Sequence, residues 1–499
     1  MKQSAPLTLA AVTAALAALT GLAALTTPAA GGNAADAGAA AARMPVERSL
    51  LVCPAPSSSD IADTTYTSYT PAGTGAAAPA DGAKGAARLL GATQEAKPVL
   101  EPKEPGRPAA ATASGADAPA LTGSSEGVMA PGWTVQQTTK VSVGRARGLL
   151  GVSCTAPGTD FWFPAVSTGR GREDSVHLTN LDDEAAVVDI KLFGPDGIAK
   201  PAAGTSENIR VDPRSTKGVL LSSLIPGTQL ADVTAHVTTR AGRVGASVQV
   251  AEEGVGADWL PAAAEPAGSL VLPGIPADAT SVRLVAFVPG DEDADLTLRL
   301  AGPNGAITPA GNEQLHVKAG MTAAVDLGDL TRGEPGSLVL APADPKKAAP
   351  VVAAVRVVRG SGAKQELGFV PAAGPVGPRA AVAGNRTEEN ATVLSLTAPG
   401  GQDAKVRVTA SPGTEGGEAA TQEVTVKAGT TQAVPAAPAG GKGTYALTVE
   451  TLSGGPVHAA RVLTLPHDGI TMFTVQALTD DHSTVSVPRA AQDLSVLTG

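Results

Sequence analysis

A pattern of short apolar segments and polar turns recurs three times in the chain after residue 158. Each copy contains a unit of the form Val-x-x-Gly-x-Thr, at residues 211–216, 317–322 and 426–431, and Arg214 takes the place of the glycine in the first copy. The copies are spaced by roughly a hundred residues, which is the size of one β-sandwich domain. The spacing therefore predicts an array of similar domains.

Within each copy, apolar and polar positions alternate over short stretches. In residues 295–300, three leucines fall on one face of a strand, whereas Thr297 and Arg299 fall on the other. Turn signals such as Gly-Pro-Asp-Gly at residues 194–197 separate about seven strands in each copy. We therefore expect an all-β chain, a tandem array of about three Ig-like antiparallel β-sandwiches, preceded by an N-terminal signal or anchor helix.

The same pattern sets the expected domain boundaries. The section before the first copy contains strand-like pieces between long stretches of Ala, Gly, Pro, Ser and Thr, so we expect it to be irregular, packed on the first sandwich and partly disordered within residues 71–130. Residues 484–488 resemble an opening strand and are expected to close the last sandwich. The expected sections are the irregular section at 48–157 and sandwiches at 158–265, 266–374 and 375–499.

The first thirty residues resemble an export signal. Lys2 precedes an uncharged apolar stretch at residues 7–25, and small residues follow it. The stretch is also long enough to remain as a membrane anchor. We expect residues 1–30 to be either a cleaved signal peptide or an anchor, and residues 31–47 to be a flexible tether. Either reading places the rest of the chain outside the cytoplasmic membrane.

The chain has two cysteines, Cys53 and Cys154. In an exported protein, an even and sparse cysteine count predicts one disulfide between them. The alternative is a pair of free, buried thiols.

Composition argues against several classes of function. The net charge is −10, aromatic residues make up 2% of the chain, and basic residues do not cluster with aromatic ones, so we expect no nucleic-acid partner. Histidines lack metal-ligand spacing, and the chain has neither a nucleophile elbow nor a phosphate-binding loop. The acidic run at residues 291–295 could supply oxygen ligands to calcium, but a solvated turn explains it better. We therefore expect no catalytic residue, cofactor or metal.

Aromatic residues give the remaining candidate for a ligand surface. Trp162, within a Phe-Trp-Phe run, and Trp133 could form a platform on which sugars stack, although the run at 161–163 aligns with a core strand of the second copy. Trp259 aligns with Phe369 and Phe473 and is expected to fill a core or an interdomain contact.

The order of these motifs resembles a known family. It comprises Val46-Glu47-Arg48 before Cys53-Pro54, then Cys154 before Trp162, and Asp258-Trp259-Leu260-Pro261. The pattern is similar to that of an uncharacterised family, a domain of unknown function, of secreted or membrane-anchored proteins from high-GC Gram-positive bacteria. The resemblance implies an envelope location and brings no reaction or ligand.

Together these features favour a non-enzymatic, extracytoplasmic scaffold or interaction protein of the cell envelope, with an envelope protein or glycan as partner. The alternatives are a glycan-binding sandwich protein and, more weakly, an envelope hydrolase with a site between domains. Membrane contact would occur only through an uncleaved N-terminal helix.

Overall fold

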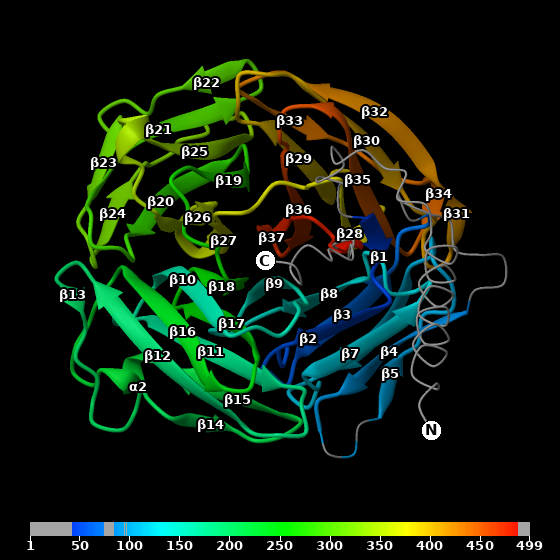
Figure 1. The fold of residues 1–499 in the computed structure, drawn as a ribbon, viewed down its shortest axis with the longest axis horizontal. Coiled ribbons are helices and arrows are strands. Elements are labelled where there is room, and N and C mark those ends of the chain that lie inside the picture. The colour runs from blue at the N-terminus through cyan, green and yellow to red at the C-terminus, as the bar shows by residue number, and fades with distance from the viewer. Residues whose placement is uncertain (1–41, 74–83, 94, 96, 488–499) are drawn as a thin grey trace, which may run out of the picture. The chain divides into compact units, whose positions relative to one another are not determined.

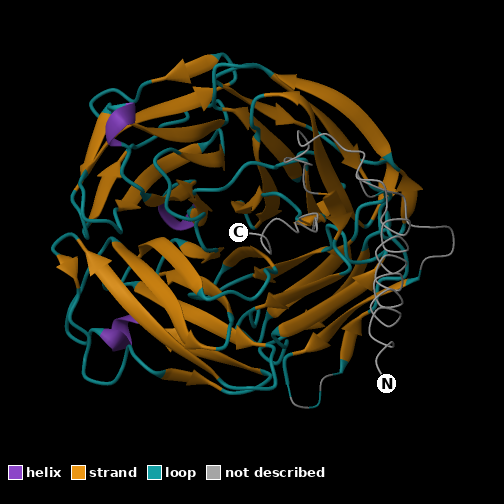
Figure 2. Ribbon diagram, in the orientation of Figure 1, coloured by secondary structure: helices purple, strands orange, loops and turns teal. Residues whose placement is uncertain are grey.

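The computed structural model describes residues 42–73, 84–93, 95 and 97–487 (Figure 1). The expected signal or anchor, and most of the expected tether, lie outside these residues. The described chain is built almost entirely of antiparallel strands, so the all-β prediction is confirmed (Figure 2). No helix in the described part is long and apolar enough to cross a membrane.

The section expected to be irregular, residues 48–157, instead forms a complete sandwich of two four-stranded sheets, which we name module 1. Many of its strands are rich in Ala, Ser and Thr, so their pairing comes from the neighbouring strands and not from a strong apolar alternation. Module 1 contains β2 (Arg48–Cys53), β3 (Ala62–Tyr69), β4 (Gly85–Gly91), β5 (Pro98–Leu100), β6 (Ala109–Ser114), β7 (Leu121–Gly127), β8 (Thr134–Val141) and β9 (Gly148–Ser153).

Three further sandwiches follow, within the three expected sections. Module 2 contains β10 (Asp160–Val166), β11 (Arg172–Asn180), β12 (Ala186–Gly194), β13 (Gly197–Ile198), β14 (Ile209–Val211), β15 (Ser215–Leu220), α2 (Leu221–Leu224), β16 (Val233–Ala241), β17 (Gly245–Glu252) and β18 (Gly256–Leu260). Module 3 contains β19 (Leu270–Ile275), β20 (Ala279–Phe287), β21 (Ala294–Gly302), β22 (Gly305–Ile307), β23 (Gln314–Val317), β24 (Thr322–Asp326), β25 (Gly336–Pro342), η1 (Pro345–Lys347), β26 (Val352–Arg359), η2 (Gly362–Lys364) and β27 (Glu366–Pro371).

Module 4 completes the series. It contains β28 (Arg379–Arg386), β29 (Thr392–Ala398), β30 (Ala404–Ala410), β31 (Gly416–Glu418), β32 (Ala420–Val426), β33 (Thr430–Val434), β34 (Ala439–Lys442), β35 (Thr444–Gly454), β36 (His458–His467) and β37 (Ile470–Leu478). The segment expected to close this sandwich, β38 (Thr484–Val487), pairs instead with β1 (Ala42–Pro45) in a separate two-stranded sheet.

All four modules share one strand order. Numbered by the eight strands of module 1, one sheet runs first, sixth, third, fourth, as in β2-β7-β4-β5, and the other runs fifth, second, seventh, eighth, as in β6-β3-β8-β9. Modules 2 to 4 insert one or two further short strands, and their strands are named here by the equivalent position in module 1, so β18, β27 and β37 are eighth strands like β9. An immunoglobulin sandwich places its first strand beside its second. Here the first strand pairs with the sixth, so the sandwiches are not Ig-like in topology, and that part of the fold prediction is wrong. Strand count and alternation carry no information on which strands pair, which is why the sequence did not distinguish the two.

The Val-x-x-Gly-x-Thr unit marks the turn where the chain crosses from one sheet to the other. The fourth residue of the unit has a positive φ angle in every copy: +69° at Gly320, +69° at Gly429 and +48° at Arg214. A carboxylate from the loop before the third strand stabilises this turn. Asp293 Oδ1 accepts a hydrogen bond from the Ala319 amide at 2.8 Å, and Asp403 accepts one from the Ala428 amide in module 4. The acidic positions therefore have a structural role in the turn.

The modules of the compact unit at residues 45–484 close into a cycle (Figure 1). The eighth strands meet at its centre, where β9 contacts β18 and β37, and β27 contacts the same two strands. Near the two ends of this unit, the Val46 amide donates to the Ser483 carbonyl at 2.9 Å. The expected tandem array is thus a closed set of four sandwiches.

Apolar cores extend across the module boundaries. The core of module 2 includes Val358 and Phe369 of module 3, and the core of module 3 includes Phe473 of module 4. Phe369 and Phe473 are fully buried, and Trp259 is 1% exposed. These aromatic side chains on the eighth strands therefore pack where modules meet.

Candidate functional site

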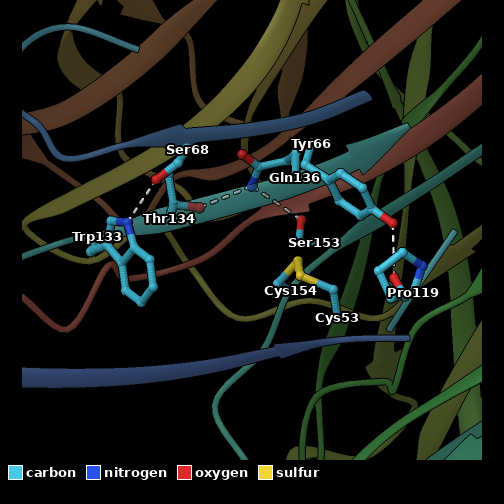
Figure 3. The surroundings of a disulfide bond; sticks show 9 residues. All are labelled: Cys53, Tyr66, Ser68, Pro119, Trp133, Thr134, Gln136, Ser153 and Cys154. Atoms are coloured by element: carbon cyan, nitrogen blue, oxygen red, sulfur yellow. Dashed lines mark hydrogen bonds between the residues drawn. A yellow bond between two sulfur atoms is a disulfide. The ribbon is translucent and has the colours of Figure 1, made fainter. Parts of the chain in front are cut away.

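The two cysteines form a disulfide that ties the first strand of module 1 to the end of its last strand (Figure 3). Cys53 closes β2, Cys154 follows β9, and both lie in a core with Trp133 and Tyr66. The tyrosine hydroxyl donates to the Pro119 carbonyl at 2.9 Å. The bond is typical of proteins that fold in an oxidising compartment.

Trp133, one of the two aromatic candidates for a ligand surface, lies inside module 1. Its side chain is 5% exposed, and its indole N–H donates to the Ser68 hydroxyl at 2.8 Å (Figure 3). A sugar cannot stack on a ring in this position, because the ring face is already covered by core residues.

Trp162, the second candidate, is half-buried at the junction of modules 2 and 3. Its ring stacks on His236 with centroids 3.6 Å apart and lies 5.4 Å from the ring of Phe287 in module 3. Burial lowers the pKa of His236, and a hydrogen bond with Asp160 opposes this effect. Trp162 thus contributes to an intermodule aromatic cluster, and the structure does not bring it near Trp133.

A second group of polar residues, which sequence patterns did not single out, surrounds the centre of the cycle. Arg147, the residue before β9, reaches across to module 3 and donates to the carbonyls of Ala363 and Gln365, and to that of Val255 in module 2. Its guanidinium lies 3.9 Å from the Glu366 carboxyl group, whose side chain is 1% exposed. Burial raises the pKa of Glu366 to about 9, and Arg147 offsets only part of this effect.

Asp258 of β18 is the other buried carboxyl group at this centre. One of its oxygens accepts hydrogen bonds from the Gly151 amide of module 1, at 3.0 Å, and from the Thr474 hydroxyl of module 4, at 3.2 Å. Burial raises the pKa of Asp258 well above its usual value, although both donors oppose the effect. Asp258 and Glu366 are each 0% exposed, so neither can touch a substrate as the structure stands.

A small cavity opens above Arg147 at one end of the central strands. It has a volume of about 300 Å³, and the turns between the seventh and eighth strands of three modules line it, with Arg145, Glu252, Val255 and His467 among the lining residues. Charges of both signs meet here, and Arg145 also pairs with Glu253 at 3.6 Å. Arg147 also lines the cavity, so the cavity leads from the surface to the central polar group.

A larger groove, about 590 Å³, lies between modules 1 and 2, and we name it the junction groove. Its floor is the outer face of the sheet that contains β11, β15 and β17, and its wall is the connection from β2 to β3 with the turn after β6. The floor residues are Glu173, Ser175, His177, Gly218, Leu220, Gln249 and Ala251; the wall and end residues are Ala55, Ser57, Ser58, Ala116, Arg145 and Ala146.

The junction groove exists because this junction departs from the other three. The first strands β10, β19 and β28 each pack along the two middle strands of the next module's sheet, whereas β2 makes its main contact with β17 alone. Val52 of β2 packs closely on Gly245 at one end of β17, and the Pro56 carbonyl accepts from the Gln249 amide at 3.0 Å. These two contacts and the ion pair between Arg145 and Glu173 border the groove, which lies on the sheet face between them.

Among the residues that the structure describes, no group of three or more His, Cys, Asp or Glu side chains is placed to hold a metal ion. Asp295, in the acidic run that could supply oxygen ligands to calcium, instead contacts His316 at 2.8 Å.

Residues 109–437 match the model of a family of unknown function, DUF5719. This match covers more than half of the chain. The chain belongs to the DUF5719 family. The DUF5719 match begins with β6 in module 1 and ends after β33 in module 4, so it includes parts of all four modules. The expected resemblance to a domain of unknown function is confirmed, and no curated protein matches the chain.

Sequence reasoning missed both the central polar group and the junction groove. Arg147, Glu366 and Asp258 stand far apart in the chain and share no motif, and only the cyclic closure brings them together. One signal was present: Gly148 and Gly256 begin the innermost strands, and a Cβ on either would lie within 3 Å of Glu366 Oε1, at 2.9 and 2.6 Å. Glycines at the start of two aligned strands can mark such a close approach.

Proposed function

We propose that this DUF5719 member is a non-enzymatic interaction protein of the cell envelope that acts outside the cytoplasmic membrane. The observation that carries the proposal is the junction groove, a cleft formed by two modules whose relative positions are held by the cycle of contacts. A ligand site between domains is a common arrangement in binding proteins. The four fused sandwiches act as the scaffold that keeps its walls in place.

The disulfide and the sequence support the proposed location. A buried Cys53–Cys154 bond is favoured where the environment is oxidising, and the first thirty residues have the pattern of an export signal or anchor. We extend the proposal to the secreted or membrane-anchored character, and the high-GC Gram-positive origin, that the sequence resemblance implies. Membrane contact is proposed only through an uncleaved N-terminal helix, and no role in nucleic-acid binding is proposed.

Glycan binding is the second candidate. It is favoured by the hydroxyl, amide and imidazole groups on the floor of the junction groove, in place of the tryptophans that the sequence first suggested. The hydrolase alternative is weaker, because the two carboxyl groups with raised pKa values, Asp258 and Glu366, lie out of reach of a substrate.

Cell fractionation of the producing organism tests the proposal. A C-terminally tagged chain is expected in the envelope fraction, with Cys53 and Cys154 linked, and N-terminal sequencing decides between cleavage and anchoring. Cross-linking on intact cells should join the chain to an envelope component. A chain found in the cytosol with free thiols, or one secreted without any retention by isolated envelopes, would overturn the proposal.

A further inference from the structure

We propose that the junction groove binds a neutral carbohydrate chain. This inference rests on the proposed function and adds the chemical class of the ligand. In modules 1, 3 and 4, the first strand of the preceding module in the cycle covers one face of a sheet. The groove floor is the equivalent sheet face of module 2.

The floor of the groove presents side chains that match sugar hydroxyl groups. In the strand register, His177 lies opposite Gly218, and Ser175 lies opposite both Leu220 and Gln249, so these residues share one face of the sheet. The serine hydroxyl, glutamine amide and imidazole each donate or accept hydrogen bonds. Leu220, which is 41% exposed, adds an apolar surface for the C–H face of a sugar ring.

The charge of the groove favours a neutral ligand. Arg145 and Glu173 stand together at one end and pair with each other. Burial lowers the pKa of His177 to about 4, so its imidazole is uncharged at neutral pH. A charged ligand would lose hydration without gaining an unpaired opposite charge on the floor, and that loss is costly.

His177 also has a fixed orientation. Its ring meets the edge of the Trp259 ring at an interplanar angle of 78°, with centroids 5.1 Å apart. Trp259 lies opposite Gln249 in the register, on the same sheet face as His177, and because it is 1% exposed and held between modules 1 and 2 it packs against the imidazole from the side. A side chain that is already fixed loses little entropy on binding a ligand.

The geometry favours a carbohydrate over a peptide. Peptides that bind to sheets add a strand to a free edge through main-chain hydrogen bonds. The groove floor is a sheet face, and β11 and β17 already have strands paired on both sides, so their main-chain groups are engaged. Of the three floor strands, β15 is the one with a free outer edge, and that edge lies at the margin of the groove. Recognition on the floor must therefore come from side chains, as in sugar binding.

Two attachments hold the wall of the groove. Ala55 and Ser57 lie two and four residues after Cys53, so the disulfide anchors the start of this segment. The Gln249 side chain, on the floor, donates to the carbonyl of Pro56 in the same segment. The wall is thereby fixed both to the end of β9 and to the floor.

The experiment blocks the groove from a position that tolerates a side chain. Gly218 has open space where a Cβ would be, and its backbone is not in the left-handed region, so Gly218→Trp meets no clash at its Cβ and is chosen to place an indole over the floor. Gly400→Trp is the matched control, because Gly400 also has open space and lies in a turn of module 4. His177→Ala removes one recognition group and leaves the groove open.

Binding is measured by calorimetry and by affinity electrophoresis of the full exported chain with soluble neutral oligosaccharides and polysaccharides: glucans, mannans, galactans and arabinans. At least one is expected to bind, with affinity reduced tenfold or more by Gly218→Trp, reduced by His177→Ala, and unchanged by Gly400→Trp. Thermal unfolding of each variant checks that the fold is retained.

Three outcomes overturn the inference: none of these saccharides binds, binding is unaffected by Gly218→Trp, or the chain instead selects peptides from an extended peptide library. If isolated envelopes still retain a chain that binds no saccharide, the proposed function stands and the ligand class is wrong. If isolated envelopes retain neither the native chain nor the Gly400→Trp control, the proposed function fails as well.

Discussion

Arg147 in module 1 and Glu366 in module 3 meet at 3.9 Å, which joins two modules that are neighbours neither in the chain nor in the cycle. The arginine also donates to carbonyls of modules 2 and 3, so one side chain contacts both modules across the centre. A buried group of this kind makes the position of each module depend on the others. We expect residues 45–484 to unfold as one cooperative unit.

The pH dependence of the free energy of unfolding should reflect the titration of Glu366. Its carboxyl group binds a proton up to about pH 9 in the folded chain, but only up to about 4.5 when unfolded. Between these values the folded state holds the extra proton, so the free energy of unfolding falls as pH rises, by up to about 1.4 kcal/mol per unit. Glu366→Gln should flatten this slope and stabilise the chain at pH 8, measured by urea unfolding from pH 5 to 9. An unchanged slope would show that Glu366 does not titrate in this interval.

Removal of the disulfide should destabilise the whole unit. Cys53 and Cys154 are 101 residues apart, and a bridge over a loop of this length stabilises by about 2–5 kcal/mol. Cys53→Ser with Cys154→Ser should lower the midpoint of thermal unfolding to the value of the reduced native chain. If reduction leaves the midpoint of the native chain unchanged, the bond contributes nothing to stability.

The contact between Val52 and Gly245 should be sensitive to a single methyl group. A Cβ on Gly245 would overlap the Val52 side chain, so Gly245→Ala is expected to cost about 1–3 kcal/mol through overpacking. Val52→Ala should recover part of this loss, since it removes the overlapping group. The double-mutant cycle, measured by chemical unfolding, should give a coupling of at least about 1 kcal/mol; additive effects would show that the two residues do not touch.

The buried pair of Arg379 and Asp481 should contribute to closing module 4 on module 1. The arginine lies 2.5 Å from Asp481 and also donates to carbonyls of module 1, and both side chains are less than a tenth exposed. Arg379→Met leaves an unpaired buried carboxylate and should cost about 3–5 kcal/mol. The exposed pair of Arg210 and Asp212 is the control, because Arg210→Met should cost at most about 1 kcal/mol. Equal effects of the two substitutions would contradict the assigned role.

The sequence predicted the strands of modules 2 to 4 because large apolar residues alternate there and the Val-x-x-Gly-x-Thr turn recurs. It failed for module 1, where strands such as Ala109–Ser114 consist of small residues and the corresponding positive-φ glycine, Gly106, lies among prolines without the motif. Strands of this kind are specified by their neighbours, and a local pattern cannot report them.

The candidate sites were harder to predict for a related reason. The disulfide needed only two cysteines and an export signal. The junction groove depends on how far β2 reaches over module 2, and the central polar group depends on closure of the cycle. Both depend on packing between modules, and strand periodicity gives no information on that packing. The burial of Trp133 likewise follows from module 1 having a core of its own.

The hydrogen bond between Val46 and Ser483 brings the entry and the exit of residues 45–484 to one point. A string of sandwiches in series lengthens with every repeat and transmits tension from its first domain to its last. Here the two ends of the unit lie together, so additional modules would enlarge the cycle without increasing the distance between the ends. A pull applied to both ends would load the β1–β38 pairing and this contact before it loaded any sandwich.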